Sequence, residues 1–237
     1  MDDNRDKTVF RFKEFEVEQG RSAMKVGTDG VLLGAWCDVG GAERVLDIGC
    51  GTGLISLMVA QRNSGALIDA VDIDKDSAEE ASFNFRNSKW AGRLNSLCKD
   101  VLGYVAQPYD LIVSNPPFFN TGKSAPDGRR ALARHCIALP FDALFRKVDS
   151  LLSQAGIFAM IAPAEVRTEV EFCAGESDFW IKRRMAVSSK VGKPAMRYLW
   201  EFVKYPVELE ISELAIHSAD GYTASYCALT GDFYLNI

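Results

Sequence analysis

The most chemically informative residues are four consecutive ones, Asn115-Pro116-Pro117-Phe118. Two adjacent prolines fix φ and make the backbone rigid at this point. A rigid turn can present the amide oxygen of Asn115 and the carbonyl oxygen of Pro116 as two fixed acceptors for one planar NH₂ group. Such acceptors orient the nitrogen and favour a pyramidal geometry with its lone pair exposed, which is catalysis by orientation and electrostatic stabilisation. Phe118 adds an aromatic face on which a base can stack.

A second candidate site is the glycine-rich segment 47–53, DIGCGTG. It lacks the GxxxxGK[ST] pattern, which excludes a phosphate-binding P-loop. Asp47 precedes the glycines, and a carboxylate there repels a pyrophosphate but suits a cationic amino-acid ligand. Asp72 ends the next apolar run roughly twenty residues later, where a carboxylate can accept both hydroxyls of a ribose. Asp74 is the weaker ribose candidate, and a dinucleotide site with Asp72 on the ribose of NAD is the alternative.

A third candidate lies before the glycines, in the glycine-flanked segment 25–30, KVGTDG. Lys25, Thr28 and Asp29 could close over the amino-acid end of a cofactor. The alternative is a polar turn in which Thr28 or Asp29 caps a short helix that contains Val31. The two roles are compatible.

Alternating apolar and amphipathic segments must position these residues. They predict one α/β domain with a doubly wound, mainly parallel sheet of seven strands, in which ligands bind at the carboxyl ends of the strands. Residues 1–35 would form a lead and cofactor-closing loop, and residues 36–237 the catalytic domain. A further segment, 209–216, is expected to pair with strand 197–204. The predicted strands are 44–48, 66–72, 95–99, 109–114, 156–161, 185–189 and 197–204, and the predicted helices are 54–61, 76–86, 141–152 and 165–173.

The formal net charge is −5, so the chain lacks the excess of basic residues that is typical of nucleic-acid-binding domains. Basic residues are nevertheless concentrated in two stretches, 123–134 and 182–204. The second holds seven basic residues and one acid, Glu201. Even on a protein of acidic net charge, a local basic surface can attract a polyanion. The alternative is that these basic residues only face solvent and bind no ligand.

The remaining composition predicts a soluble, cytoplasmic monomer. No apolar run is long enough to cross a bilayer, and the polar N-terminus has no signal-peptide core. The six cysteines form no CxxC pair, and only His135 and His217 could assist them, so we expect no metal site. His135 follows an arginine cluster, which favours a phosphate or loop-packing role over that of a general base.

The sequence resembles the bacterial tRNA1(Val) N6-adenine methyltransferases over roughly residues 10–205. The resemblance is carried by a phenylalanine-rich lead, KVGTDG, an LLGAW helix, DIGCGTG, NPPF and the later Ala133-Arg134-His135. The glycine segment also resembles motif I of class I methyltransferases, and NPPF matches the (N/D)PP(Y/F/W) motif of amino-methyltransferases. Phe118 stands where some members have tyrosine, which retains stacking.

This resemblance implies transfer of a methyl group from S-adenosylmethionine to the exocyclic N6 of an adenine in the tRNA anticodon loop. The catalytic residues would be Asn115 to Phe118. The cofactor would be bound by Lys25, Thr28, Asp29, Asp47, Gly49, Gly51, Gly53, Asp72 and, at its adenine amine, Asp100. Candidate tRNA contacts are Arg129, Arg130, Arg134, Lys182, Arg183, Arg184, Lys190 and Lys193.

Other enzymes use the same tetrapeptide on cytosine N4, guanine N2 or a glutamine amide. Release-factor glutamine methyltransferases usually carry a helical N-terminal domain, whereas only about forty residues precede the glycine segment here. Ribosomal RNA guanine-N2 enzymes usually have a second, larger domain, and DNA adenine methyltransferases a recognition insertion. A non-catalytic binding module would be expected to lose the glycine segment or Asn115, and both are present.

Overall fold

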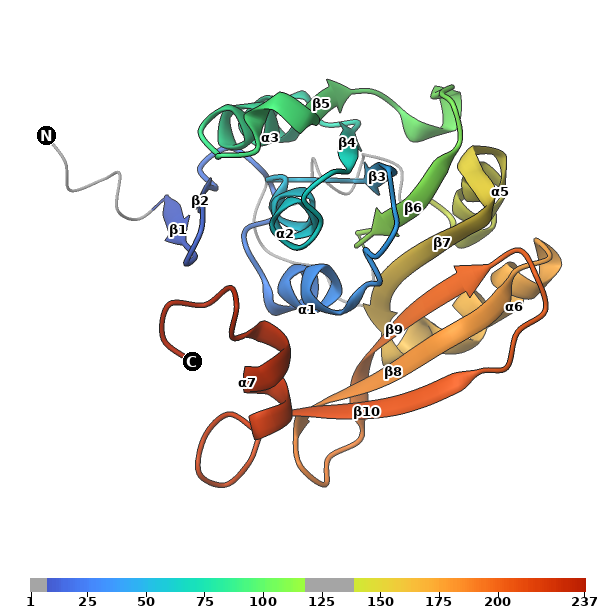
Figure 1. Cartoon of the computed structure of the whole chain (residues 1–237). Helices are drawn as coiled ribbons and strands as arrows, with labels where there is room; N and C mark the ends of the chain where they lie inside the picture. Colours follow the sequence, from blue (N-terminus) through green and yellow to red (C-terminus); the bar gives the residue numbers. More distant parts are fainter. Residues whose placement is uncertain (1–7, 118–138) are drawn as a thin grey trace, which may run out of the picture.

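The computed structural model describes residues 8–117 and 139–237. Its centre is an eight-stranded sheet with the order β10-β8-β9-β7-β6-β3-β4-β5 (Figure 1). Only β9 runs antiparallel to its neighbours, so the other seven strands end at the same edge of the sheet. The strands are β3 (Arg44–Ile48), β4 (Leu67–Asp72), β5 (Leu94–Cys98), β6 (Tyr109–Ser114), β7 (Leu152–Pro163), β8 (Trp180–Lys190), β9 (Ala195–Val203) and β10 (Glu210–His217).

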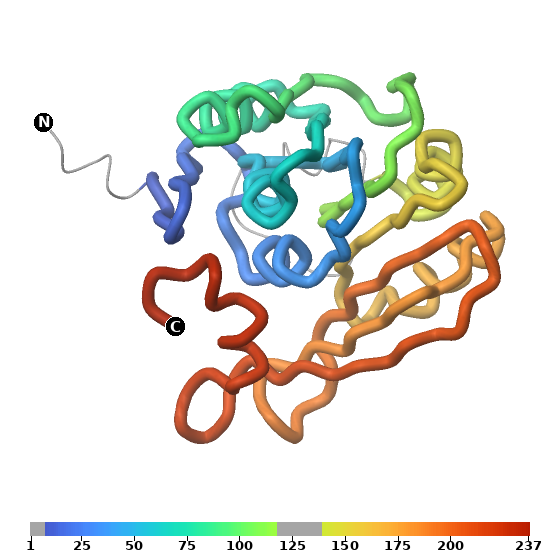
Figure 2. The backbone as a smooth tube through the Cα atoms, in the orientation of Figure 1, coloured from blue at the N-terminus to red at the C-terminus, as the bar shows by residue number. Residues whose placement is uncertain are grey.

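Helices cover both faces of the sheet, as the doubly wound prediction requires (Figure 2). Successive residues of β3 show the two layers, because Val45 belongs to one buried cluster and Leu46 to the other. The first cluster includes residues of α1 (Thr28–Trp36), α2 (Leu54–Arg62), α3 (Lys75–Arg86) and α7 (Ala224–Thr230), and the second those of α5 (Phe141–Leu151) and α6 (Arg167–Glu176). Three short 3₁₀ turns are η1 (Ala91–Arg93), η2 (Val101–Gly103) and η3 (Ala164–Val166).

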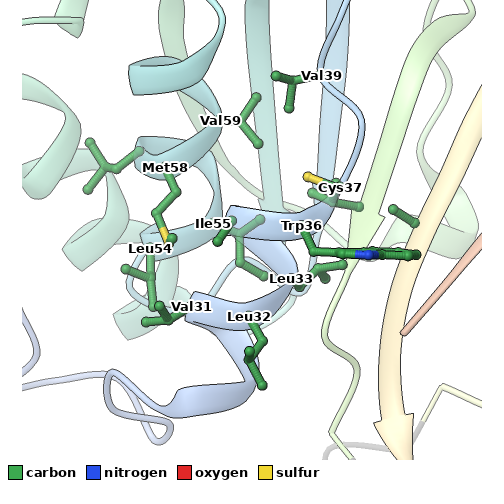
Figure 3. Close-up of a cluster of buried hydrophobic side chains, with 14 of the residues drawn as sticks. Val31, Leu32, Leu33, Trp36, Cys37, Val39, Leu54, Ile55, Met58 and Val59 are labelled. Atoms are coloured by element: carbon green, nitrogen blue, oxygen red, sulfur yellow. The ribbon is translucent and has the colours of Figure 1, made fainter. Parts of the chain in front are cut away.

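Helices α1 and α2 pack closely. Because α1 precedes the glycine segment 47–53 and α2 follows it, this packing fixes the two flanks of that segment against each other. Figure 3 shows their shared apolar cluster, with Val31, Leu54 and Met58 among its members. A Cβ added at Gly34 would lie 2.7 Å from the Met58 sulfur, so the glycine permits this close approach. The LLGAW segment is thus part of the buried core.

The N-terminal lead forms a small antiparallel hairpin of β1 (Val9–Arg11) and β2 (Glu16–Glu18). Phe12 and Phe15 are buried, and their rings stack with centroids 4.7 Å apart. The Phe12 ring also lies 5.8 Å from that of Tyr234, near the C-terminus. The phenylalanine-rich lead is therefore packed into the main core.

One prediction about this architecture and one alternative interpretation of the sequence are wrong. The segment that contains β10 pairs with β8 in parallel and not with strand 197–204. The reason is that β9 already has β7 on one side and β8 on the other, so β9 has no free edge, whereas β8 has one. Helix α1 is capped by Gly27 with no side-chain hydrogen bond, so neither Thr28 nor Asp29 is its N-cap.

Within the described parts of the chain, no helix combines the length and apolarity needed to cross a membrane. The same residues contain no group of three metal-ligating side chains.

Candidate active site

The two principal motifs meet at the carboxyl edge of the sheet. Strands β3 and β6 are parallel neighbours, with Ile48 opposite Ser114. The Ser114 hydroxyl donates to the Ile48 carbonyl at 2.9 Å and ties the two strand ends together. Asn115 and the first glycine of DIGCGTG follow directly, so the candidate acceptor site for an amine lies beside the glycine segment.

The tetrapeptide is partly accessible from this edge. Asn115 is half-buried, Pro116 is buried and Pro117 is exposed. A half-buried amide on a backbone fixed by proline is positioned and still open to a ligand. Phe118 lies outside the described residues, as do Arg129, Arg130, Arg134 and His135.

The glycine segment turns tightly and leaves open space beside its backbone. Gly49, Gly51 and Gly53 have φ values of +70°, +54° and +80°, which favour glycine. A Cβ at Gly53 would lie 2.5 Å from the Phe85 ring, so this glycine permits close packing on α3. A Cβ at Gly49 or Gly51 would meet nothing within 4 Å, so a ligand can approach the backbone there.

Asp47 is the most unusual ionisable group of the site. Its side chain is fully buried, and its Oδ2 accepts hydrogen bonds from the backbone N–H and hydroxyl of Ser56 at 3.2 and 2.7 Å. Its Oδ1 has no partner among the described residues. Burial, together with the charge of nearby Asp72, raises the pKa of Asp47 to about 7, although the Ser56 hydrogen bonds oppose the shift. An unpartnered buried carboxylate oxygen is costly, and a cationic ligand group would satisfy it.

Asp72 is bonded to the glycine segment, whereas Asp74 is used by a helix. The Asp72 Oδ2 accepts the Gly51 N–H at 2.8 Å, and burial raises the pKa of this carboxyl. The Asp74 carboxylate caps α3 by accepting the N–H and hydroxyl of Ser77 at 2.9 and 2.7 Å. This division favours Asp72 as the ribose partner. Asp100 caps η2 and is exposed, one residue before that turn.

The KVGTDG segment reaches the same edge of the sheet but is held by internal contacts. Lys25 donates to the Gln19 carbonyl at 3.1 Å. Asp29 pairs with Arg197 at 2.8 Å, which links α1 to the start of β9. Lys25 and Thr28 are exposed. Their predicted contact with a cofactor stays a prediction.

Known proteins similar to this chain identify its family. The family described as "Methyltransferase small domain" matches residues 26–139. The tRNA1(Val) (adenine(37)-N6)-methyltransferase of Aeromonas salmonicida is 44% identical over 230 residues, which cover 96% of this chain and 98% of the relative. A protein of the same name from Yersinia enterocolitica is 40% identical, with 96% and 92% covered. The chain belongs to the tRNA1(Val) (adenine(37)-N6)-methyltransferase family.

Solved structures support the fold of this family member. A predicted O-methyltransferase from Agrobacterium tumefaciens superposes with a TM-score of 0.68 at 19% identity, covering 89% of this chain and all of the other. A ribosomal protein L11 methylase from Lactobacillus delbrueckii gives 0.57 at 18% identity, with 80% and 84% covered. These matches confirm the predicted methyltransferase fold, with eight strands in the sheet where seven were expected.

The basic stretch 182–204 of this family member divides into two parts. Lys182 lies 3.3 Å from Asp38, Arg183 binds the fully buried Glu201 at 2.8 Å, and Arg184 lies 2.8 Å from Glu171. These three charges are paired with carboxylates of the chain, which argues against their predicted use as tRNA contacts.

Lys190 and Lys193, in contrast, are exposed around the turn between β8 and β9. Neither lysine pairs with a carboxylate of the described chain. Their positive charges are therefore available to a ligand at the catalytic edge.

Sequence reasoning missed Asn84, which joins the lead to the glycine segment. Its Nδ2 donates to the carbonyls of Thr52 and Glu18, both at 2.9 Å, and its Oδ1 accepts the Glu18 N–H at 2.8 Å. Asn84 belongs to a buried polar set on α3 with Ser77 and Glu80, at spacings of three and four residues. These polar residues are spaced three and four apart, as the apolar residues of a buried helix face usually are. This pattern is the signal in the sequence that could have identified Asn84.

Proposed function

We propose that this protein transfers a methyl group from S-adenosylmethionine to the N6 of adenine 37 in tRNA1(Val). The observation that carries the proposal is the position of Asn115 beside the glycine segment, at the ends of the paired strands β3 and β6. The names of relatives that are 40–44% identical over nearly the whole chain support adenine and tRNA as the substrate.

The residues beside the glycine segment fit this cofactor. Asp47 has an unpartnered, buried carboxylate oxygen that suits the cationic ammonium of an amino acid. The space beside Gly49 and Gly51 admits a ligand close to the backbone. The Asp72 carboxylate is held beside this segment by the Gly51 N–H, and its remaining lone pairs can accept hydrogen bonds from ribose hydroxyls. When bound, the cofactor supplies an electrophilic methyl group on a sulfonium.

The Asn115 amide oxygen and the Pro116 carbonyl would accept the two N–H bonds of the adenine amine. Conjugation with the ring makes this amine a weak nucleophile, and two acceptors on one side favour a pyramidal nitrogen with its lone pair toward the methyl group. The amine nitrogen would form a bond to the methyl carbon as the bond between that carbon and the sulfonium sulfur breaks. A neutral thioether would leave, and one proton of the nitrogen would be lost to water. Phe118 would stack on the base, and the unpaired bases of an anticodon loop can turn outward into such a site.

The experiment that tests the proposal offers the protein four substrates with labelled S-adenosylmethionine: total tRNA, ribosomes, DNA and release factor. We expect label in tRNA alone. Label only in release factor would favour glutamine methylation, and label only in ribosomes would favour guanine N2 of ribosomal RNA. Either outcome would overturn the proposed substrate.

A further inference from the structure

A second group of exposed polar and aromatic residues lies at the carboxyl edge of the sheet, beyond the candidate active site. Strands β8 and β10 end there, with Lys190 opposite His217. The Val191 N–H donates to the His217 carbonyl at 2.9 Å and fastens the β8–β9 turn to the end of β10. The loop after β10 returns through an isolated bridge between His217 and Tyr222. Figures 1 and 2 show this loop and the β8–β9 turn projecting side by side from the sheet.

Three aromatic rings at this place form a continuous stack. The rings of His217 and Tyr222 have centroids 4.8 Å apart, and those of Tyr222 and Tyr226 are 5.0 Å apart, with interplanar angles of 27° and 28°. Tyr226 is buried in the main core, whereas Tyr222 is 51% exposed and His217 is also exposed. The stack thus runs from a fixed ring in the core, through Tyr222, to the exposed ring of His217 at its outer end. An aromatic surface held rigidly in this way loses little conformational entropy when it binds a planar ligand.

The charge beside this stack is mainly positive. Lys190 and Lys193 are exposed and have no carboxylate partner in the described chain, and the neighbouring turn contributes one acid, Asp220. Exposed aromatic rings next to unpaired lysines are the combination that binds single-stranded nucleic acid, because bases stack on the rings and phosphates attract the cations. The same residues would not suit an apolar protein partner, which favours surfaces with few charges at their centre.

The spacing of the strands decides which nucleotide this surface can reach. The sheet order places β8 three strands and β10 four strands from β6, which carries Asn115. Neighbouring strands lie about 4.8 Å apart, so the surface is roughly 14–19 Å from the strand that ends at the catalytic turn. An adenine bound at Asn115 cannot also stack there, whereas a nucleotide a few positions away in the same RNA can.

We propose that His217, Tyr222, Lys190 and Lys193 form a docking site for an unpaired nucleotide of the tRNA substrate other than the methylated adenine. This inference rests on the proposed function. It assigns a role to the C-terminal segment, which the catalytic motifs leave unexplained, and it explains how a single domain of acidic net charge can hold an RNA.

The test compares tRNA methylation by wild-type protein with that of Tyr222→Leu, Tyr222→Phe and the double variant Lys190→Ala/Lys193→Ala. Tyr222→Leu removes the middle ring of the stack, which supports the exposed ring of His217. Loss of one base-stacking contact on that outer ring should raise the KM for tRNA about 5- to 150-fold. Tyr222→Phe should stay near wild type because it keeps the ring. The double lysine variant should reduce the slope of log KM against log salt by about 1.4, the value for two contacts to single-stranded phosphates.

Two further measurements separate RNA docking from a loss of folding. The dissociation constant for S-adenosylmethionine and kcat at saturating tRNA should be unchanged in every variant. Tyr205→Leu is the matched control, because Tyr205 is an exposed aromatic residue just after β9, at the opposite edge of the sheet. If Tyr222→Leu lowers Tm, His217→Ala replaces it as the test of the stack.

Unchanged tRNA KM values in both the ring and the lysine variants, with wild-type protein active on tRNA, would overturn the docking site and leave the proposed function intact. Wild-type protein that methylates another substrate and no tRNA would instead overturn the proposed function, and the docking site with it.

Discussion

Asp47→Asn tests the assignment of the cofactor site by separating stability from binding. The substitution keeps the size of the side chain and an oxygen that can accept the Ser56 hydrogen bonds, but it removes the charge. In the cofactor-free protein the pKa of Asp47 is raised from 3.8 to about 7, a difference of three units. At about 1.4 kcal/mol per unit, the buried carboxylate lowers the free energy of unfolding by about 4 kcal/mol above pH 7.

The sign of the pH dependence follows from this direction. A pKa that is higher in the folded state gives a stabilising contribution that is complete below pH 3.8 and is lost as the pH rises through about 7. Asp47→Asn removes this loss but leaves a buried amide NH₂ group unpaired, at a cost of about 1–3 kcal/mol. The cofactor-free variant should therefore be about 2 kcal/mol more stable than wild type at pH 8, and its Tm about 4–8 °C higher.

Cofactor binding should respond in the opposite direction. A hydrogen bond to a charged group contributes about 1.5–3 kcal/mol, so the variant should bind S-adenosylmethionine about 10- to 150-fold more weakly at pH 7.5. In wild type, the dissociation constant should rise about tenfold for each pH unit below 7, because the carboxyl must lose its proton to bind a cation. The variant should not show this rise.

Isothermal titration calorimetry from pH 5 to 7.5 and thermal unfolding of the cofactor-free proteins provide the two measurements. Asp110→Asn is the control, since Asp110 accepts backbone N–H groups near the start of β6, at the edge away from the glycine segment. Equal cofactor affinity in Asp47→Asn and wild type, or a wild-type affinity that does not change between pH 5 and 7, would refute the assignment.

Three other substitutions test the structural account. Arg183→Met leaves the fully buried Glu201 without its closest cation. The free energy of unfolding should fall by about 3 kcal/mol in urea titrations, and the tRNA KM should be unchanged. A raised KM at unchanged stability would contradict this. Gly53→Ala places a Cβ 2.5 Å from the Phe85 ring at a φ of +80° and should cost about 2–4 kcal/mol in the same assay. Asn84→Ala breaks the link between the lead and the glycine segment and should cost about 2–3 kcal/mol and weaken cofactor binding in calorimetry, whereas unchanged binding would show that the link is not needed there.

The sequence predicts which strand ends meet at the carboxyl edge of the sheet. Each strand can be recognised from its own apolar run, and parallel strands always end at the same edge. The apolar runs at 44–48 and 109–114 are the strands β3 and β6, and the residues that follow them meet because both strands run in the same direction. The preference for Asp72 over Asp74 also came from a local feature, the end of the apolar run.

The features that sequence reasoning missed depend on partners that lie far apart in the chain. Arg183 looks like a free basic residue until Glu201, eighteen positions later, is seen to be buried beside it. The pairing of β10 with β8 depends on which strand edge remains free, and this follows only from the whole sheet order. Asn84 binds Glu18, sixty-six positions earlier, so its role appears only when the lead is folded onto α3.

The most direct test of the central claim is methylation of two unmodified tRNA1(Val) transcripts that differ only at position 37, adenosine in one and guanosine in the other. Wild-type protein with S-adenosylmethionine should produce about one N6-methyladenosine per adenosine-37 transcript, measured by mass spectrometry of the digested nucleosides, and none in the guanosine-37 transcript. Asn115→Ala should produce none in either transcript while binding the cofactor with nearly wild-type affinity. Methylation of the guanosine-37 transcript, a different methylated nucleoside, or an active Asn115→Ala variant would contradict the account.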